Sequence, residues 1–344
     1  MNKKLIALAV AAASISSLAN AAEVYSDETS SLAVGGRFEA RGVVADNDEG
    51  STKVTDKTRV RINVAGKTDI TDSLYGIGFW EGEYTNEGTS NSDGNLDNRY
   101  MFAGMGGTYG QVVYGKADGS LGMLTDFTDI MAYHGNEAGN KIAAGDRTGN
   151  NLAYTGSFDL GGNNLTFKAN YVFEGNSDTT TSTGLGGIVT ESTTDYDDGY
   201  SVGTIYTMDM GLSFGAGYGE QKIVGDEDAQ KQAFGAISYT YGDFYVAGLY
   251  QDARHTVANS DKQRGYELAA AYTWDKTVFT STYNYREDRS NNVDLNDAIA
   301  IDATHYFNSN FRTYASYKFN MLDSDKVGKA AASDEFVLGA RYDF

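Results

Sequence analysis

The sequence has no cysteine and no proline, and only three of its 344 residues are histidine. Without cysteine, disulfides, thiol nucleophiles and thiolate metal sites are excluded. The histidines, His134, His255 and His305, fall in separate segments, which leaves little material for acid–base or metal chemistry. We therefore expect neither a cofactor nor a metal site, and we expect that the protein is not an enzyme.

A long hydrophobic run is also missing. A membrane helix needs about 20 consecutive apolar residues, and no segment after the N-terminal run approaches this. The chain starts with a basic segment, Asn2 to Lys4, followed by a short apolar run, Leu5 to Ala13, and the small-residue motif Ala19-Asn20-Ala21. This pattern predicts a secretory signal peptide over residues 1–21, so the mature chain begins at Ala22.

Basic residues are scarce relative to acids. The chain has 27 Lys and Arg against 47 Asp and Glu, a net charge of −20, and removing Lys3 and Lys4 with the leader takes it to −22. Nucleic-acid binding needs basic patches, so we expect no nucleic-acid partner. The acidic balance is typical of a protein with acidic surface loops that attracts cations.

The chain is rich in glycine and tyrosine, with 41 and 25 residues. Its mean hydropathy is −0.42, which resembles that of a soluble protein. The last segment, 335–344, alternates with the period of a β-strand. One face is apolar and ends in aromatics: Phe336, Leu338, Ala340, Tyr342 and Phe344. The other carries Glu335, Arg341 and Asp343. Such a strand can separate lipid from a water-filled lumen.

The same alternation recurs along the chain, for example in 32–46, 58–69, 74–84 and 98–106. In the last of these we expect Tyr100 and Phe102 on one face and Arg99 on the other. Short and long connections alternate between the segments, as they do in outer-membrane barrels. Counting them gives about sixteen strands, and a barrel of this size encloses an aqueous channel. A soluble β-sandwich or propeller would instead have shorter strands, an apolar interior and proline in its loops.

One long connection, residues 117–146, differs from the others. It contains Leu121, Leu124 and Phe127, which are too apolar for a disordered loop and need a surface to pack on. We expect this loop to fold back into the lumen and to constrict the pore. Asp126 and Asp129, three residues apart, would then share one side of a helical turn.

Five arginines are expected on the polar, inward faces of their strands, because each would cost about 2–4 kcal/mol on the lipid face near the midplane. They are Arg37, Arg59, Arg61, Arg99 and Arg147. Acids on the loop facing bases on the wall would create a transverse field that favours polar solutes. The arginines have an alternative role, because salt bridges among them could simply hold the wall together.

Several segments resemble the Gram-negative general-diffusion porins, above all the OmpU-like major outer-membrane porins of vibrios. The resembling segments include Ala22-Glu23-Val24-Tyr25, Leu96-Asp97-Asn98-Arg99-Tyr100, Thr125-Asp126-Phe127-Thr128-Asp129-Ile130-Met131 and Arg341-Tyr342-Asp343-Phe344, and together they cover the mature chain in order. The resemblance implies an all-β, 16-stranded antiparallel transmembrane β-barrel over residues 22–344, with the third outer loop folded inward.

The resemblance also implies roles for single residues. Arg37, Arg61, Arg99 and Arg147 match the family's basic wall cluster. Asp129 matches an acid of the constriction loop, and Glu81 matches a lumen carboxylate. Phe344, with Tyr342, matches the terminal signal that the barrel-assembly machinery reads. One departure concerns the loop, where Ala132 and Tyr133 stand in place of a Pro-Glu pair of enterobacterial relatives.

These observations predict a porin of the bacterial outer membrane, a homotrimer surrounded by outer-membrane lipid and lipopolysaccharide. It would pass small polar solutes and ions by diffusion, with a preference for cations. Three alternatives remain open at this point. A barrel enzyme would use His255 beside Asp252, an adhesin would use acidic segments such as 46–49 and 226–228, and a sugar-specific porin would need an aromatic track, for which Phe79 and Tyr133 are candidates.

Overall fold

The structure is a computed structural model that describes residues 21–46, 51–85, 96–183, 189–257 and 260–344. Of the expected leader, only Ala21 falls within this range, and Asn47, Asp48 and Glu49 of one acidic loop also lie outside the described residues. In the described part of the chain, no helix has the length and apolar character needed to cross a bilayer.

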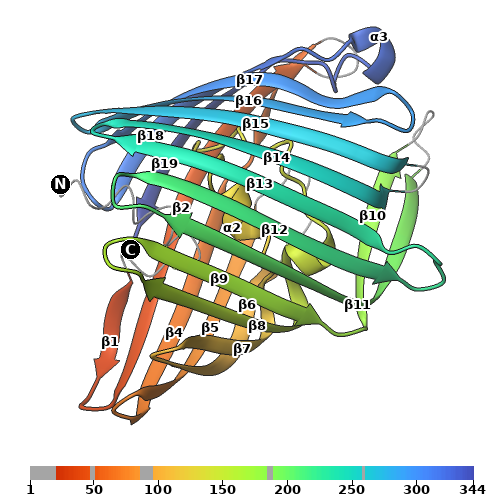
Figure 1. Cartoon of the computed structure of the whole chain (residues 1–344). Coiled ribbons are helices and arrows are strands. Elements are labelled where there is room, and N and C mark those ends of the chain that lie inside the picture. Colours follow the sequence, from red (N-terminus) through yellow and green to blue (C-terminus); the bar gives the residue numbers. More distant parts are fainter. Residues whose placement is uncertain (1–20, 47–50, 86–95, 184–188, 258–259) are drawn as a thin grey trace.

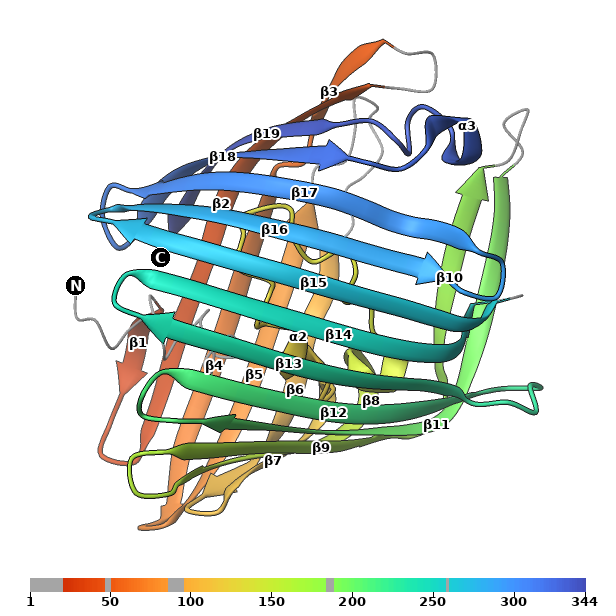
Figure 2. The ribbon, with the colours of Figure 1, turned by 45° about the horizontal axis from the view of Figure 1, so that its top comes forward.

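The chain forms a closed antiparallel β-barrel, and Figures 1 and 2 show its strands inclined around a common interior. Among the described residues, nineteen strands join one sheet, and β1, β3 and β10 lie beside the ring, which leaves sixteen in the wall. Each wall strand pairs with the next one along the chain, and β19 closes the ring by pairing with β2. The predicted all-β, sixteen-stranded barrel is confirmed.

The strands have the following bounds. The wall consists of β2 (Ser30–Asp46), β4 (Arg59–Thr71), β5 (Leu74–Thr85), β6 (Leu96–Gly107), β7 (Gly110–Asp118), β8 (Arg147–Asp159), β9 (Asn164–Val172), β11 (Val189–Thr207), β12 (Leu212–Ile223), β13 (Gln230–Tyr241), β14 (Phe244–Val257), β15 (Ser260–Trp274), β16 (Thr277–Asp288), β17 (Val293–Tyr306), β18 (Phe311–Asn320) and β19 (Glu335–Asp343). Beside it, β1 (Ala22–Ser26) and β3 (Thr52–Asp56) pair with β2, and β10 (Asn176–Thr183) pairs with β11.

Burial in the wall is inverted relative to a soluble protein. In β15, Leu268 exposes 57% of its surface on the outside, whereas its neighbour Glu267 is fully buried inside the barrel. In β19, Leu338 is 56% exposed and Val337 is fully buried. An apolar outer face and a polar inner face suit a wall between lipid and water, because the strands satisfy all backbone hydrogen bonds within the ring.

The strands β1 and β19 both pair with β2. The backbone of Phe344 exchanges two hydrogen bonds with Gly36 of β2, at 2.9 and 3.0 Å. Two residues earlier on β2, Val34 pairs with Ala22 of β1. Consequently β1 continues the line of β19 along the same edge of β2.

Strand β6 departs from the predicted alternation. Tyr100 pairs with Glu81 and Asn98 pairs with Gly82, which leaves Arg99 as the extra residue of a β-bulge. The bulge lets Arg99 and Tyr100 both face the interior, since Arg99 Nε donates to Glu81 and Tyr100 Oη donates to Asp118. Phe102, paired with inward Phe79, faces the interior as well. The prediction that Tyr100 and Phe102 lie on the face opposite Arg99 was therefore wrong.

Candidate functional site

Residues 119–146, which we call the insert, connect β7 to β8. They contain the short helix α2 (Gly122–Thr125) and the 3-10 helix η2 (Ala143–Gly145), and Figures 1 and 2 show α2 within the ring of strands. Leu121, Leu124 and Phe127 are fully buried against inward side chains of β11, β13, β14 and β15. An apolar contact inside a polar barrel explains why this loop, unlike the others, needs apolar residues.

Polar contacts anchor the insert along the same side of the wall. Near its start, the backbone N–H of Ser120 donates to Asn170 of β9 and to Ser201 of β11, at 3.0 and 2.9 Å. Near its end, the backbone N–H of Ile142 donates to Gln232 of β13 at 2.9 Å. These groups satisfy backbone donors that would otherwise be buried without partners.

Glu267 of β15 is the anchor in the middle of the insert. Its carboxylate accepts a hydrogen bond from the hydroxyl of Thr128 and another, at 2.9 Å, from the backbone N–H of Ala138. Beside it, Gln251 of β14 donates to the carbonyl of Ala138 at 2.5 Å. A buried carboxylate therefore joins the outgoing and the returning arms of the insert.

The tip of the insert reaches β18, β19 and β2. His134 is buried, with Nδ1 2.8 Å from Ser316 Oγ of β18 and Nε2 3.5 Å from a carboxylate oxygen of Glu335. Tyr133 lies under the guanidinium of Arg41, 5.2 Å from ring centre to carbon, and packs on the cluster that contains Tyr314. The insert thus follows the inner wall from β9 around to β19.

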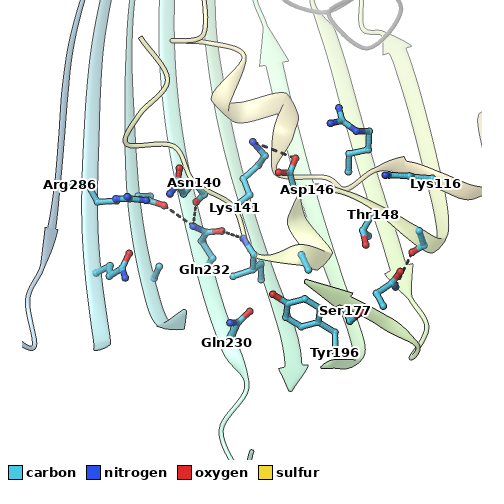
Figure 3. A pocket seen from close by; sticks show the side chains of 18 of the residues that line it. Lys116, Asn140, Lys141, Asp146, Thr148, Ser177, Tyr196, Gln230, Gln232 and Arg286 are labelled. Carbon is cyan, nitrogen blue, oxygen red and sulfur yellow. Dashed lines mark hydrogen bonds and ion pairs between the residues drawn. The ribbon is translucent and has the colours of Figure 1, made fainter. Parts of the chain in front are cut away.

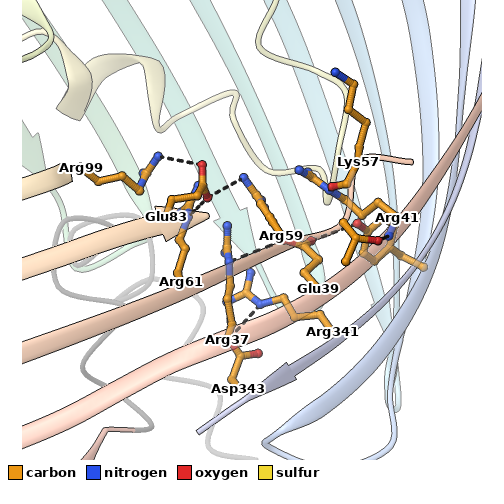
Figure 4. Close-up of polar contacts among 12 residues, drawn as sticks. Arg37, Glu39, Arg41, Lys57, Arg59, Arg61, Glu83, Arg99, Arg341 and Asp343 are labelled. Carbon is orange, nitrogen blue, oxygen red and sulfur yellow. Dashed lines mark hydrogen bonds and ion pairs between the residues drawn. The ribbon is translucent and has the colours of Figure 1, made fainter. Parts of the chain in front are cut away.

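An arginine-rich surface faces the insert from the other side of the barrel (Figure 4). The arginines alternate with carboxylates along neighbouring strands. Arg59 pairs with Glu39 at 2.7 Å and with Glu83 at 3.3 Å, and Arg61 also pairs with Glu83. Arg99 pairs with Glu81 at 2.8 Å, and Arg37 lies 3.6 Å from Glu39. On β19, Arg341 pairs with Asp343 at 2.5 Å.

The insert and the arginine-rich surface line one common cavity of about 450 Å³. The insert contributes its residues from Asp129 to Tyr133. The wall contributes seven arginines: Arg37, Arg41, Arg59, Arg61, Arg99, Arg312 and Arg341. Glu39 and Asp302 are the wall acids in the lining. This arrangement sets an exposed loop carboxylate across a water-filled space from a field of guanidinium groups.

The predicted site residues do not all meet in this cavity. Asp129, Arg37, Arg59, Arg61 and Arg99 line it. Glu81 does not, because its buried side chain is held by Arg99. Asp126 also lies outside the lining and interacts with Lys168 of β9 rather than with the arginine-rich surface.

Arg147 lines a second cavity, of about 670 Å³, on the outer side of the insert. Figure 3 shows Lys141 beside Asp146 and Gln232 beside Asn140 at this cavity: Lys141 Nζ lies 3.6 Å from Asp146 Oδ1, and Gln232 Nε2 donates to the carbonyl of Asn140 at 2.6 Å. Arg147 remains linked to the arginine-rich surface through Tyr100, because Arg147 and Arg99 lie 4.9 and 6.0 Å from the centre of that ring.

Both aspartates of the insert lie deep inside the barrel, where many protein atoms reduce their contact with water. The side chain of Asp129 is nevertheless exposed to the cavity. Desolvation raises the pKa of Asp126 to about 7, opposed by the positive charge of Lys168. Desolvation also raises the pKa of Asp129, opposed by Lys141. Both carboxyl groups consequently take up protons at a higher pH than ordinary aspartates do.

The sequence-based site omitted several residues of the cavity. Arg41 and Glu39 share the inward face of β2 with Arg37, and Arg341 shares the inward face of β19 with Asp343. The alternation of inward and outward residues along each strand could have identified Arg41, Glu39 and Arg341 as lining residues. Arg312 and Asp302 gave no comparable signal, because the register of β17 and β18 was ambiguous in the sequence.

Comparison with known proteins agrees with this architecture. The model of the family described as Gram-negative porin matches residues 7–343. Porin-like protein L of Photobacterium profundum is 62% identical, and outer membrane protein U of Vibrio cholerae El Tor is 48% identical, with each alignment covering all of both chains.

Solved structures share the fold. OmpF of Salmonella typhi superposes with a TM-score of 0.77 at 23% identity, covering 94% of this chain and all of that chain. OmpT of Vibrio cholerae, solved in a trimer form, gives a TM-score of 0.64 at 16% identity over 92% of this chain and all of that chain. The chain therefore belongs to the Gram-negative porins, which form β-barrel channels in the bacterial outer membrane.

Proposed function

We propose that residues 22–344 form one channel domain, exported by a cleaved leader, that lets small hydrophilic solutes and ions diffuse across the outer membrane with a preference for cations. The insert is the constriction of this channel, and the cavity that it shares with the arginine-rich surface is the narrowest part of the route. The observation that carries the proposal is that Asp129 and the wall arginines line the same cavity.

Asp129 and the acidic balance of the whole chain support the preference for cations. Four carboxylates, Glu39, Glu81, Glu83 and Asp343, pair with arginines of the wall and offset part of the charge of the seven arginines that line the cavity. Asp129 faces the passage and has no ion pair among the described residues. Beyond the constriction, the net charge of −20 concentrates cations at the mouths of the channel.

We further propose that the channel is a homotrimer that does no catalysis. Vibrio cholerae OmpT has been solved in a trimer form, and we extend that assembly to this chain. The best catalytic geometry, His134 with Ser316 and Glu335, is enclosed: Ser316 is 1% and His134 is 4% exposed, so a substrate has no access to it.

Single-channel recording in a planar bilayer, under a gradient of potassium chloride, tests these proposals together. We expect openings in groups of three equal steps and a zero-current potential of cation-selective sign. Single independent steps would contradict the trimer, and a zero-current potential of the opposite sign would contradict the cation preference. Absence of conductance from folded protein would contradict the open channel.

A further inference from the structure

The inner faces of β5 and β6 carry four aromatic residues that the proposed constriction does not use. Tyr75, Phe79, Tyr100 and Phe102, here called the aromatic strip, lie on inward positions of two paired strands. The ring centres of Phe79 and Phe102 are 5.5 Å apart, and Tyr100 lies 5.8 Å from Phe79 and 6.4 Å from Phe102. All four side chains are half-buried, so each keeps part of its surface toward the lumen.

The strip runs along the wall away from the arginine-rich surface. Tyr75 is next to the tight turn between β4 and β5, whereas Tyr100 pairs with Glu81, beside the ion pairs of Arg99. Short turns mark the periplasmic end of a porin barrel. The strip therefore extends from the constriction toward the periplasmic mouth.

Cations flank the strip at both ends. The ammonium of Lys67 lies 4.7 Å from the ring centre of Tyr75, and Lys67 pairs with Asp69 at 3.4 Å. At the other end, the guanidinium carbons of Arg99 and Arg147 lie 6.0 and 4.9 Å from the ring centre of Tyr100. Arg99 pairs with Glu81, whereas Arg147 has no ion pair among the described residues, so a negatively charged group of a solute would find positive charge mainly at the Tyr100 end.

Tyr75 is held flat against the wall by a glycine. A Cβ atom placed on Gly106 would come within 2.4 Å of the Tyr75 ring, so only glycine lets this ring lie over the neighbouring strand. The ring consequently presents a face to the lumen rather than projecting into it. Flat, half-exposed rings suit stacking with a planar solute.

We propose that the aromatic strip is a binding site for small solutes that combine an aromatic ring with a carboxylate. The ring stacks on Phe79 and Phe102, and the carboxylate lies toward Arg99 and Arg147. The site slows such solutes after they pass the constriction and raises their local concentration in the lumen. This inference rests on the proposed function, because solutes reach the strip only through an open channel.

A purely structural role predicts a different behaviour. Phe102 and Ile77 pack on the buried cluster of Val113, Ala117 and Ala153, and the strip could serve only to cover it. In that case aromatic and aliphatic carboxylates of equal charge would pass in the same way. A binding site would instead hold an aromatic carboxylate longer than an aliphatic carboxylate, and an aromatic anion longer than an aromatic cation.

The test is single-channel recording with benzoate, hexanoate or benzylammonium added to potassium chloride. The unmodified protein is compared with the double variant Phe79→Leu/Phe102→Leu, which keeps apolar side chains but removes both rings. Phe279→Leu is the matched control, because Phe279 faces lipid and is 43% exposed. Recording in potassium chloride alone comes first, so a protein without conductance contradicts the proposed function before the strip is tested.

We expect benzoate to interrupt the current with residence times about two to twelve times longer than those of hexanoate, the range given by one aromatic stacking contact. Benzylammonium should resemble hexanoate. The double variant should shorten the residence of benzoate to that of hexanoate, and Phe279→Leu should not. Equal residence of benzoate and hexanoate in the unmodified protein overturns the proposal, even if the double variant fails to fold. Equal residence of benzoate and benzylammonium overturns the role of the cations.

Discussion

Asp129 and Arg61 lie on the two sides of one cavity, so their charges are expected to act on a passing ion in opposite directions. A unit charge about 5 Å from an ion is worth about 0.8 kcal/mol in a water-like medium, or roughly fourfold in relative permeability. We predict that Asp129→Asn lowers the ratio of potassium to chloride permeability and that Arg61→Ser raises it, each by roughly sixteenfold at most, because the opposite effects on the two ions multiply. Zero-current potentials in a salt gradient measure both ratios.

Asp159→Asn is a suitable control for this pair. Asp159 ends β8 at a short turn and accepts hydrogen bonds from the backbone of Gly161 and Gly162. It lies outside the lining of the cavity. If this control shifted the zero-current potential as much as Asp129→Asn does, net charge rather than the constriction would set the selectivity.

The raised pKa values of the insert aspartates predict a pH dependence. A carboxyl group with a raised pKa is charged only above that pKa, so the negative charge of Asp126 is lost as the pH falls through about 7. Asp129 loses its charge at a higher pH than an ordinary aspartate does. We predict that cation preference declines continuously from pH 8 to pH 5, and zero-current potentials across this range measure the decline.

The variant Asp126→Asn/Asp129→Asn isolates the groups responsible for this dependence. It should show, already at pH 8, the selectivity that the unmodified channel has at pH 5. A variant that keeps the full pH dependence would assign the titration to other carboxylates of the lumen.

Strand alternation was enough to predict which face most wall residues occupy. Arg37 and Arg61 occupy the inward positions that the period of two assigns to them, as do Arg341 and Asp343. It failed at Tyr100 and Phe102, because a single extra residue, Arg99, reverses the phase of β6. No feature of the sequence marks this bulge, which depends on the pairing of Glu81 across the strands.

At the scale of elements, the insert is held by its middle as well as by its two ends. Glu267 receives hydrogen bonds from Thr128 on one arm and from Ala138 on the other. Hydrogen bonds to a charged acceptor are each worth about 1.5–3 kcal/mol. We predict that Glu267→Ala frees the middle of the insert, which gives larger current fluctuations in the open channel and faster proteolysis within 126–139.

Glu267→Gln is the matched control, because an amide can still bond the Thr128 hydroxyl while it loses the charge. We expect its current noise to lie between those of the unmodified protein and Glu267→Ala. In both variants the barrel should remain resistant to unfolding in detergent, since the wall strands pair independently of the insert. Noise unchanged in Glu267→Ala would mean that the apolar contacts of Phe127 and its neighbours suffice to hold the insert.

The sequence indicated that residues 117–146 need a packing surface but could not indicate its location. Contacts such as Ser120 with Ser201, or His134 with Ser316, join residues that are distant in the chain. Their formation depends on the curvature of the closed wall, which alternation and turn signals do not encode. For the same reason Asp126 and Asp129 could not be assigned to different surroundings from their spacing alone.

At the scale of the whole molecule, Phe344 extends the pairing of β19 with β2 that closes the ring. Phe344 bonds to Gly36 through its backbone, and its ring lies 5.5 Å from Phe38 and 6.2 Å from Tyr342. Such aromatic pairs are each worth about 0.5–1.5 kcal/mol. We predict that Phe344→Ala lowers the amount of folded barrel in outer membranes, which the heat-dependent gel mobility of the folded form measures.

Phe319→Ala provides the comparison for this variant. Phe319 faces lipid on β18 with 44% of its surface exposed and lies away from the pairing of β19 with β2. It should affect assembly much less than Phe344→Ala does. Equal losses in the two variants would attribute the effect to missing lipid-facing area rather than to closure or to a terminal assembly signal.

The path of the insert divides the circumference of the barrel into two unlike halves. From β9 to β15 the inner wall mainly supports the insert, whereas β16 to β19 together with β2, β4 and β6 line the cavity. The interior of the barrel is therefore asymmetric. Strands of the wall that carry arginines line one side of the cavity, and a single loop, the insert, lines the other. Substitutions in the insert are therefore expected to change the channel interior without altering the ion pairs on β2, β4, β5 and β6.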